Sequence, residues 1–305
     1  MKQKAWIQIF PVLSGVFWGS AGIFVRKFEA LGFNSISIVE LRIIIAVVIL
    51  LAGILIADKS MLKIQLKDLW IFLGAGWLSM IGLNVCYNYA INTLTLSLAA
   101  VLLSLSPIFV LLMAAVIFKE KITGQKIFCI VLALIGCMLC SGIFKGGLSW
   151  NAAGVVVGAI AAVFYAAFSI FSKLAMERGY RPLTVSFYSL LAAGIALAFF
   201  TDWSTVSAVT AQDPMGMTGF FVLHSLCTSV LPYVLYTVGL NYIDAGKASI
   251  LASAEPVAAT VFGIFFYHEI PGFAEIAGLI LVMAALIYLS APQEGRLTLK
   301  KHKEA

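Results

Sequence analysis

Residues 246–267 read GKASILASAEPVAATVFGIFFY and decide the fold, because this apolar run is long enough to cross a lipid bilayer. About 20 predominantly apolar residues suffice for a membrane-spanning helix. A second run, residues 97–118 with the sequence SLAAVLLSLSPIFVLLMAAVIF, lies 149 positions earlier and places Ser106-Pro107 on Glu255-Pro256. The sequence therefore predicts membrane helices that recur in two halves of the chain.

The composition of the whole chain indicates lipid as its solvent. Of 305 residues, 62% are hydrophobic and 11% are charged, and the mean hydropathy is +1.04. A soluble domain averages about 25% charged residues, which keep its surface dispersed in water. The net charge of +6 would suit nucleic-acid binding in a soluble protein, but here the basic residues lie in short loops between apolar runs. We therefore expect an all-α integral membrane protein whose partner is the lipid bilayer and not a nucleic acid.

Ten apolar segments are predicted to span the membrane. They cover residues 6–25, 35–57, 69–91, 96–118, 126–144, 151–172, 183–200, 218–242, 246–267 and 272–290. Most linkers between them are short, so consecutive helices are expected to form hairpins. No stretch of sequence is left for a soluble domain.

Lysine and arginine residues set the predicted orientation. With the N-terminus in the cytoplasm, 16 of the 20 basic residues fall on the cytoplasmic side and 3 on the outer side, while Arg42 lies within a span. Cytoplasmic loops of membrane proteins are enriched in Lys and Arg. Both termini are therefore predicted to be cytoplasmic, in a multi-pass protein of the plasma or inner membrane.

The two halves of the chain resemble each other at fixed spacing. A shift of 149 residues aligns Tyr87 with Tyr236, and a shift of 147 aligns Trp18 with Tyr165. Each half holds five spans, and an odd number forces the second half to insert upside down relative to the first. The predicted parts are a first repeat, a second repeat and a basic cytoplasmic tail, over residues 1–145, 146–292 and 293–305. Inverted repeats are typical of carriers that work by alternating access.

Three stretches carry a resemblance to a known family. They are Ser106-Pro107 through Phe118-Lys119-Glu120-Lys121 to Gly136, then Glu255-Pro256 through Phe266-Tyr267-His268-Glu269 to Gly278, and Leu41-Arg42 ahead of the apolar run of the second span. On these stretches the chain resembles the EamA branch of the drug/metabolite transporter superfamily over nearly its whole length. The resemblance implies a ten-helix secondary carrier with a central cavity lined by both repeats. It also implies that the fifth and tenth spans lie at the periphery.

Glu255 is the first candidate for substrate binding, because an ionisable side chain inside a span is costly and is functional by default. It lies about nine residues into its span, near mid-membrane at a rise of about 1.5 Å per residue. A carboxylate there can bind a cationic group or exchange a proton, which makes Glu255 the candidate for coupling transport to protons. A structural hydrogen bond, to Ser253 or to a neighbouring helix, is the alternative.

Arg42 is the second ionisable candidate, since it stays charged in any environment. A guanidinium that faces the cavity is expected to receive a carboxylate or phosphate with two hydrogen bonds. The alternatives are an ion pair that locks two helices together or a side chain that extends to the membrane surface. Glu40, two residues away, should point to nearly the opposite helix face. Because Glu40 lies closer to the outer end of the span, we expect it at the membrane interface.

Further polar and aromatic side chains are predicted to line the same cavity. Polar faces of the third and eighth spans must turn into the bundle, and Trp18 with Tyr165 are expected to form an aromatic wall. Interhelical hydrogen bonding or simple packing is the alternative for each of these residues. The full set of candidate cavity residues is Trp18, Arg42, Asn84, Tyr87, Asn88, Tyr165, His224, Thr228, Tyr236, Ser253 and Glu255.

These features favour a secondary active carrier for small metabolites, such as amino acids, amines or drugs, by alternating access around a central cavity. Export is the direction that the family resemblance implies. A channel-like facilitator and an intramembrane enzyme are the alternatives, but no HExxH or GxSxG motif is present. We therefore expect a small-molecule substrate, with protons as a coupling ion, and no enzymatic activity, catalytic residue, cofactor or metal site. The sequence does not specify an oligomeric state.

Overall fold

Helices make up all the regular secondary structure of the described residues, which are 5–94, 96–140, 151–268 and 270–290 of this computed structural model. The first half contains η1 (Ala5–Gln8), α1 (Ile9–Gly19), α2 (Ala21–Ala30), α3 (Ser35–Ala57), η2 (Lys59–Leu62), η3 (Leu66–Asp68), α4 (Leu69–Leu73), η4 (Gly74–Ile81), α5 (Gly82–Thr93), α6 (Leu96–Leu103), α7 (Ser106–Ile117) and α8 (Gly124–Cys140). The second half contains α9 (Ala152–Glu177), α10 (Pro182–Leu197), η5 (Ala198–Phe200), α11 (Trp203–Gln212), α12 (Pro214–Ser225), η6 (Leu226–Val230), α13 (Leu231–Tyr242), α14 (Ala245–Ala252), α15 (Glu255–Tyr267) and α16 (Phe273–Ser290).

Nine helical segments within the described ranges are long and apolar enough to cross a membrane. They are Trp6–Ala30, Ser35–Ala57, Leu66–Tyr87, Leu98–Ile117, Ala152–Glu177, Pro182–Phe200, Pro214–Tyr242, Ala245–Tyr267 and Phe273–Ser290. A further apolar helix, Gly124–Leu139, is shorter. Each of the ten predicted ranges overlaps one of these ten segments. The prediction that these apolar runs form helices is therefore confirmed. Several begin at a polar N-cap that satisfies free backbone N–H groups, such as Asn34 before α3 and Asn151 before α9.

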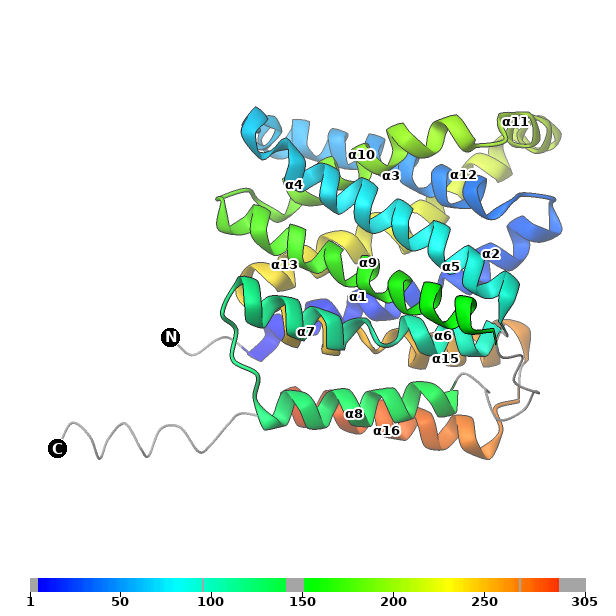
Figure 1. Cartoon of the computed structure of the whole chain (residues 1–305). Coiled ribbons are helices and arrows are strands. Elements are labelled where there is room, and N and C mark those ends of the chain that lie inside the picture. The colour runs from blue at the N-terminus through cyan, green and yellow to red at the C-terminus, as the bar shows by residue number, and fades with distance from the viewer. Residues whose placement is uncertain (1–4, 95, 141–150, 269, 291–305) are drawn as a thin grey trace.

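The first long helix of each half packs into the other half. Helix α1 contacts α13, α14 and α15, while α9 contacts α5, α6 and α7. Helices α3 and α10 form a second pair between the halves, and α8 and α16 form a third pair at one edge of the bundle (Figure 1). This edge position agrees with the periphery expected for the fifth and tenth spans. The described chain begins and α16 ends at the same end of the bundle (Figure 1).

Ionic contacts join the halves at that end, which is the predicted cytoplasmic end. Lys126 Nζ lies 3.0 Å from Asp244 Oδ2 and 3.6 Å from Glu120 Oε2, and the Lys126 and Glu120 side chains are both buried. Glu120 also accepts the backbone N–H of Ala245 at 2.7 Å, at the start of α14. The connection between α7 and α8 is therefore fastened to the first turn of α14.

Polar groups in the loop between α10 and α12 hold the short helix α11 in place. Asp202 accepts hydrogen bonds from the Ser204 and Thr205 hydroxyls, and these bonds lower its pKa to about 2. The charged carboxylate therefore caps the start of α11 at neutral pH. The backbone N–H of Asp202 also donates to Ser37 Oγ at 3.0 Å, which connects this loop to α3.

Candidate substrate site

Two broken helices meet at one cavity. The first break separates α6 from α7 at Ser104-Leu105, and the second separates α14 from α15 at Ser253-Ala254. Proline stands second in both α7 and α15, as Pro107 and Pro256, because its fixed φ suits the first turn of a helix and it has no N–H to satisfy. The breaks fall at sequence-matched positions, and side chains from both line a cavity of about 260 Å³.

Six of the predicted candidates line this cavity. They are Trp18, Tyr87, Tyr165, Tyr236, Ser253 and Glu255. They come from α1, α5, α9, α13, α15 and the second helix break, and therefore from both halves of the chain. At a rise of about 1.5 Å per residue, Glu255 lies about 15 Å from one end of the segment Ala245–Tyr267 and about 18 Å from the other, so the cavity can hold a solute away from both membrane surfaces.

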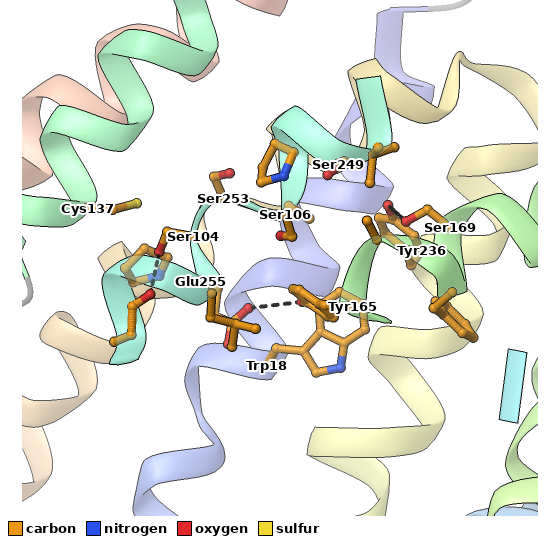
Figure 2. Close-up of a pocket in the computed structure, with 18 of the residues that line it drawn as sticks. Trp18, Ser104, Ser106, Cys137, Tyr165, Ser169, Tyr236, Ser249, Ser253 and Glu255 are labelled. Atoms are coloured by element: carbon orange, nitrogen blue, oxygen red, sulfur yellow. Dashed lines mark hydrogen bonds between the residues drawn. The ribbon is translucent and has the colours of Figure 1, made fainter. Parts of the chain in front are cut away.

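Glu255 is the one acidic residue among the side chains that line this cavity, and it is held by a neighbouring helix. The hydroxyl of Tyr165 donates to Glu255 Oε2 at 3.4 Å (Figure 2). Of the two structural partners expected from the sequence, the neighbouring helix supplies this bond, and no bond from Ser253 is found among the described residues. The distance is long for a hydrogen bond, so the carboxyl oxygens keep room for a stronger donor.

An aromatic group that includes Trp18 and Tyr165 forms one wall of the cavity. The Trp18 ring lies 6.3 Å from the Tyr165 ring, 5.4 Å from that of Tyr233 and 5.5 Å from that of Tyr236, measured between centroids. The Tyr236 hydroxyl is bound to Ser169 Oγ at 2.7 Å (Figure 2). Of these rings, those of Trp18, Tyr165 and Tyr236 line the cavity and give it an aromatic side that carries hydroxyl groups.

Several small side chains of the cavity were not predicted from the sequence. They are Ser104, Ser106, Cys137, Ser169 and Ser249. Ser106 is 5% exposed, lies across the cavity from Trp18 and Tyr165, and has no hydrogen-bond partner for its hydroxyl among the described residues (Figure 2). It stands at the position that Glu255 occupies in the other half, and this alignment was the available signal for it.

Arg42 lies outside the lining of this cavity. Its Nη1 donates to the backbone oxygen of Thr228 at 3.4 Å, and Ser225 Oγ donates to the Arg42 carbonyl at 2.7 Å. Its Nε is buried without a partner among the described residues. Arg42 therefore binds the backbone of the eighth span and does not touch the cavity.

The other predicted candidates make contacts within their own helices or with apolar neighbours. The His224 ring packs against the rings of Phe24 and Phe28, at 5.1 and 5.0 Å between centroids. Thr228 donates to the His224 carbonyl at 2.8 Å, and Asn84 donates to the Met80 carbonyl at 2.7 Å.

None of His224, Thr228 and Asn84 lines the cavity described here. The side chain of Asn88, the last candidate, lies outside the described residues. The structure therefore brings together the aromatic candidates and Glu255, and it separates them from the polar residues of η6 and α12.

Glu40 departs from its predicted position at the membrane interface. Its side chain is fully buried where α3 packs on α10, beside Gly194. The sequence expectation failed because position along a span does not determine which side of the helix faces the bundle. As expected, Glu40 forms no ion pair with Arg42 in the described structure.

Comparison with known proteins identifies the family of the chain. The model of the EamA-like transporter family matches residues 5–142 and 152–291. An uncharacterized transporter of Archaeoglobus fulgidus is 28% identical over 285 residues, covering 93% of this chain and 97% of that protein. The pseudopaline exporter CntI of Pseudomonas aeruginosa is 26% identical over 211 residues, covering 69% of this chain and 72% of that protein. A solved crystal structure shares the fold, with a TM-score of 0.75 at 16% identity over 98% of this chain and 99% of that one.

Proposed function

Because the chain belongs to the EamA-like transporter family, we propose that it is a secondary active carrier that moves small metabolites by alternating access around the cavity at the two helix breaks. Membership of a transporter family implies a small-molecule substrate and a lipid bilayer around the helices. Export across a plasma or inner membrane is the direction we favour, supported by the relative that is named an exporter.

The proposed carrier consists of two inverted five-helix repeats, residues 1–145 and 146–292, with both termini and the basic tail 293–305 in the cytoplasm. The family model matches each half separately, which supports two repeats of one unit. The two-repeat organisation is further supported by α1 and α9, each of which packs against helices of the other half. The matched helix breaks before α7 and α15 support it as well. Rocking of one repeat against the other would open the cavity first to one side and then to the other.

The observation that carries the proposal is the position of Glu255 in a cavity built from both halves. A carboxylate at this place can receive an amino group, because a hydrogen bond between two charged groups is about twice as strong as one between neutral groups. In the same cavity, the first turn of α7 and the Ser106 hydroxyl suit a carboxylate, since a helix N-terminus attracts negative charge. We therefore favour amines and amino acids as substrates.

Two sets of three related solutes test this substrate class. Leucine, isoamylamine and 4-methylpentanoate share one side chain, as do phenylalanine, phenethylamine and 3-phenylpropanoate. In counterflow into proteoliposomes, the amino acid or amine of at least one set is expected to compete about 10–100-fold better than its carboxylate, which leaves Glu255 unpaired at a cost of about 1.5–3 kcal/mol. Carboxylates that compete as well as the amines would refute the role of Glu255 in binding.

We also propose Glu255 as the residue that couples transport to protons, because an amino group and a proton would compete for the same carboxylate. Exchange of a bound proton for a substrate would then drive solute movement against its gradient. If the Glu255→Gln variant transports with an unchanged pH dependence, Glu255 is not the coupling residue.

A further inference from the structure

Glu40 is a buried carboxyl group that takes no part in the proposed substrate site. Its side chain is 0% exposed, and neither Oε1 nor Oε2 has a hydrogen-bond partner within the described ranges. An ideal Cβ on Gly194 of α10 would lie 3.8 Å from each of these oxygens and 3.1 Å from Ile43 Cγ2. The carboxyl group therefore lies against the backbone of α10 in apolar surroundings.

The nearby groups that could stabilise a negatively charged Glu40 side chain contact other partners. On α3 itself, Arg42 is bound to the Thr228 carbonyl. On α10, the hydroxyl of Tyr188 donates to the Leu62 carbonyl, near the opposite end of α3. On α12, His224 lies between phenylalanine rings.

The remaining titratable groups on elements next to α3 are Arg26, Lys27 and Glu29 of α2, Lys59 of η2, Cys227 of η6, and Asp58 and Asp202 in the flanking loops. Arg26 lies over the Tyr267 ring, Lys27 over the Phe220 ring, and Asp58 pairs with Arg181. None of these groups contacts the Glu40 oxygens.

A carboxylate without donors in such a place would lose its hydration and gain no partner, so the neutral acid is the stable form in this conformation. A metal ion does not fit as an alternative ligand. Hard cations need several oxygen ligands, and the Glu40 oxygens face Gly194 and Ile43. A proton is the ligand that this site can hold.

Resting on the carrier function proposed above, we infer that Glu40 is a proton-binding site between the two halves, filled while α3 packs on α10 and emptied when that contact opens to water. Helix α3 belongs to the first half and α10 to the second, so their contact changes if the halves rock. Because the closed contact binds the proton more tightly, a rise in pH shifts the protein toward the open contact. This proton is separate from the one proposed at Glu255.

Infrared spectroscopy and amide hydrogen exchange of the purified protein test the site without any transported solute. At neutral pH the wild-type protein should show the carbonyl stretch of a protonated carboxylic acid, and this signal should be missing in the Glu40→Gln variant and present in Glu29→Gln, which changes an exposed residue. Glu255→Gln serves to assign any second carboxyl signal.

Exchange at residues 37–44 and 190–197, corrected for the intrinsic effect of pH, should rise about fivefold or more from mildly acidic to mildly alkaline buffer. In Glu40→Gln, which mimics the protonated acid, it should stay slow at both pH values. A wild-type spectrum without the Glu40 signal would overturn the inference, as would exchange that is independent of pH or that responds to sodium ions instead. If these measurements show no proton at Glu40, the proposed carrier function is unaffected. If transport cannot be detected, these measurements still test the proton site, because they use no transported solute.

Discussion

Replacement of Glu255 by glutamine is expected to abolish most transport of amines and amino acids while the protein stays folded. Glutamine keeps the size of the side chain and can still accept the hydrogen bond from Tyr165. It removes the negative charge that would pair with an amino group, which costs about 1.5–3 kcal/mol of binding. The KM for such solutes should therefore rise about 10–100-fold.

Counterflow into proteoliposomes measures this loss, and thermal unfolding of the purified variant measures its folding. The matched control is Glu29→Gln, which removes a carboxylate from the exposed end of α2 and should transport like the wild-type protein. If Glu255→Gln transports with wild-type KM, the cavity carboxylate does not bind the substrate, and the proposed site is wrong.

Substitution of Gly15 or Gly19 by alanine is expected to destabilise the protein and to displace the second helix break. Helix α1 approaches this break so closely that an added Cβ at Gly19 would lie 2.6 Å from the Glu255 carbonyl oxygen, and a Cβ at Gly15 would meet the Ala252 carbonyl. Both obstacles are backbone atoms, which cannot rotate away. Overpacking of this kind costs about 1–3 kcal/mol per site.

Gly22 provides the matched control in the same segment, because no atom lies within 4 Å of its ideal Cβ. Gly22→Ala should unfold at the wild-type temperature or slightly above it, since alanine favours a helix over glycine. Gly15→Ala and Gly19→Ala should unfold at lower temperature and also lose transport, because the shifted backbone carries Glu255 with it. Equal stability of all three variants would show that α1 does not pack tightly against the break.

The positions of the membrane helices were predictable because long apolar runs leave few alternatives. Repeat alignment also paired Trp18 with Tyr165, and the two rings do share one wall of the cavity. Glu255 was predictable as a cavity residue since a lone carboxylate in a span has to be accommodated inside the bundle. In these cases the free-energy cost of exposing a polar side chain to lipid determines that it faces the inside of the bundle.

The rotation of each helix about its axis was not predictable in the same way. Asn84 and His224 lie on polar faces of their spans, but Asn84 binds its own helix and His224 packs against phenylalanine rings. Glu40 was expected near the membrane interface and is buried against α10. Ser169 and Cys137 gave no signal at all, because small side chains fit equally well in a packing interface or a cavity wall.

In the proposed mechanism, the cavity at the two helix breaks opens to each side of the membrane in turn. Cys137 is a native thiol that lines this cavity and is 6% exposed. A variant that keeps Cys137 while the other four of its five cysteines are replaced by alanine can be treated with a membrane-impermeant thiol reagent from either side of sealed vesicles.

Cys137 should react slowly from both sides, a transported amine should protect it, and its modification should stop counterflow. Reaction from one side alone, or reaction that leaves counterflow unchanged, would contradict alternating access through this cavity.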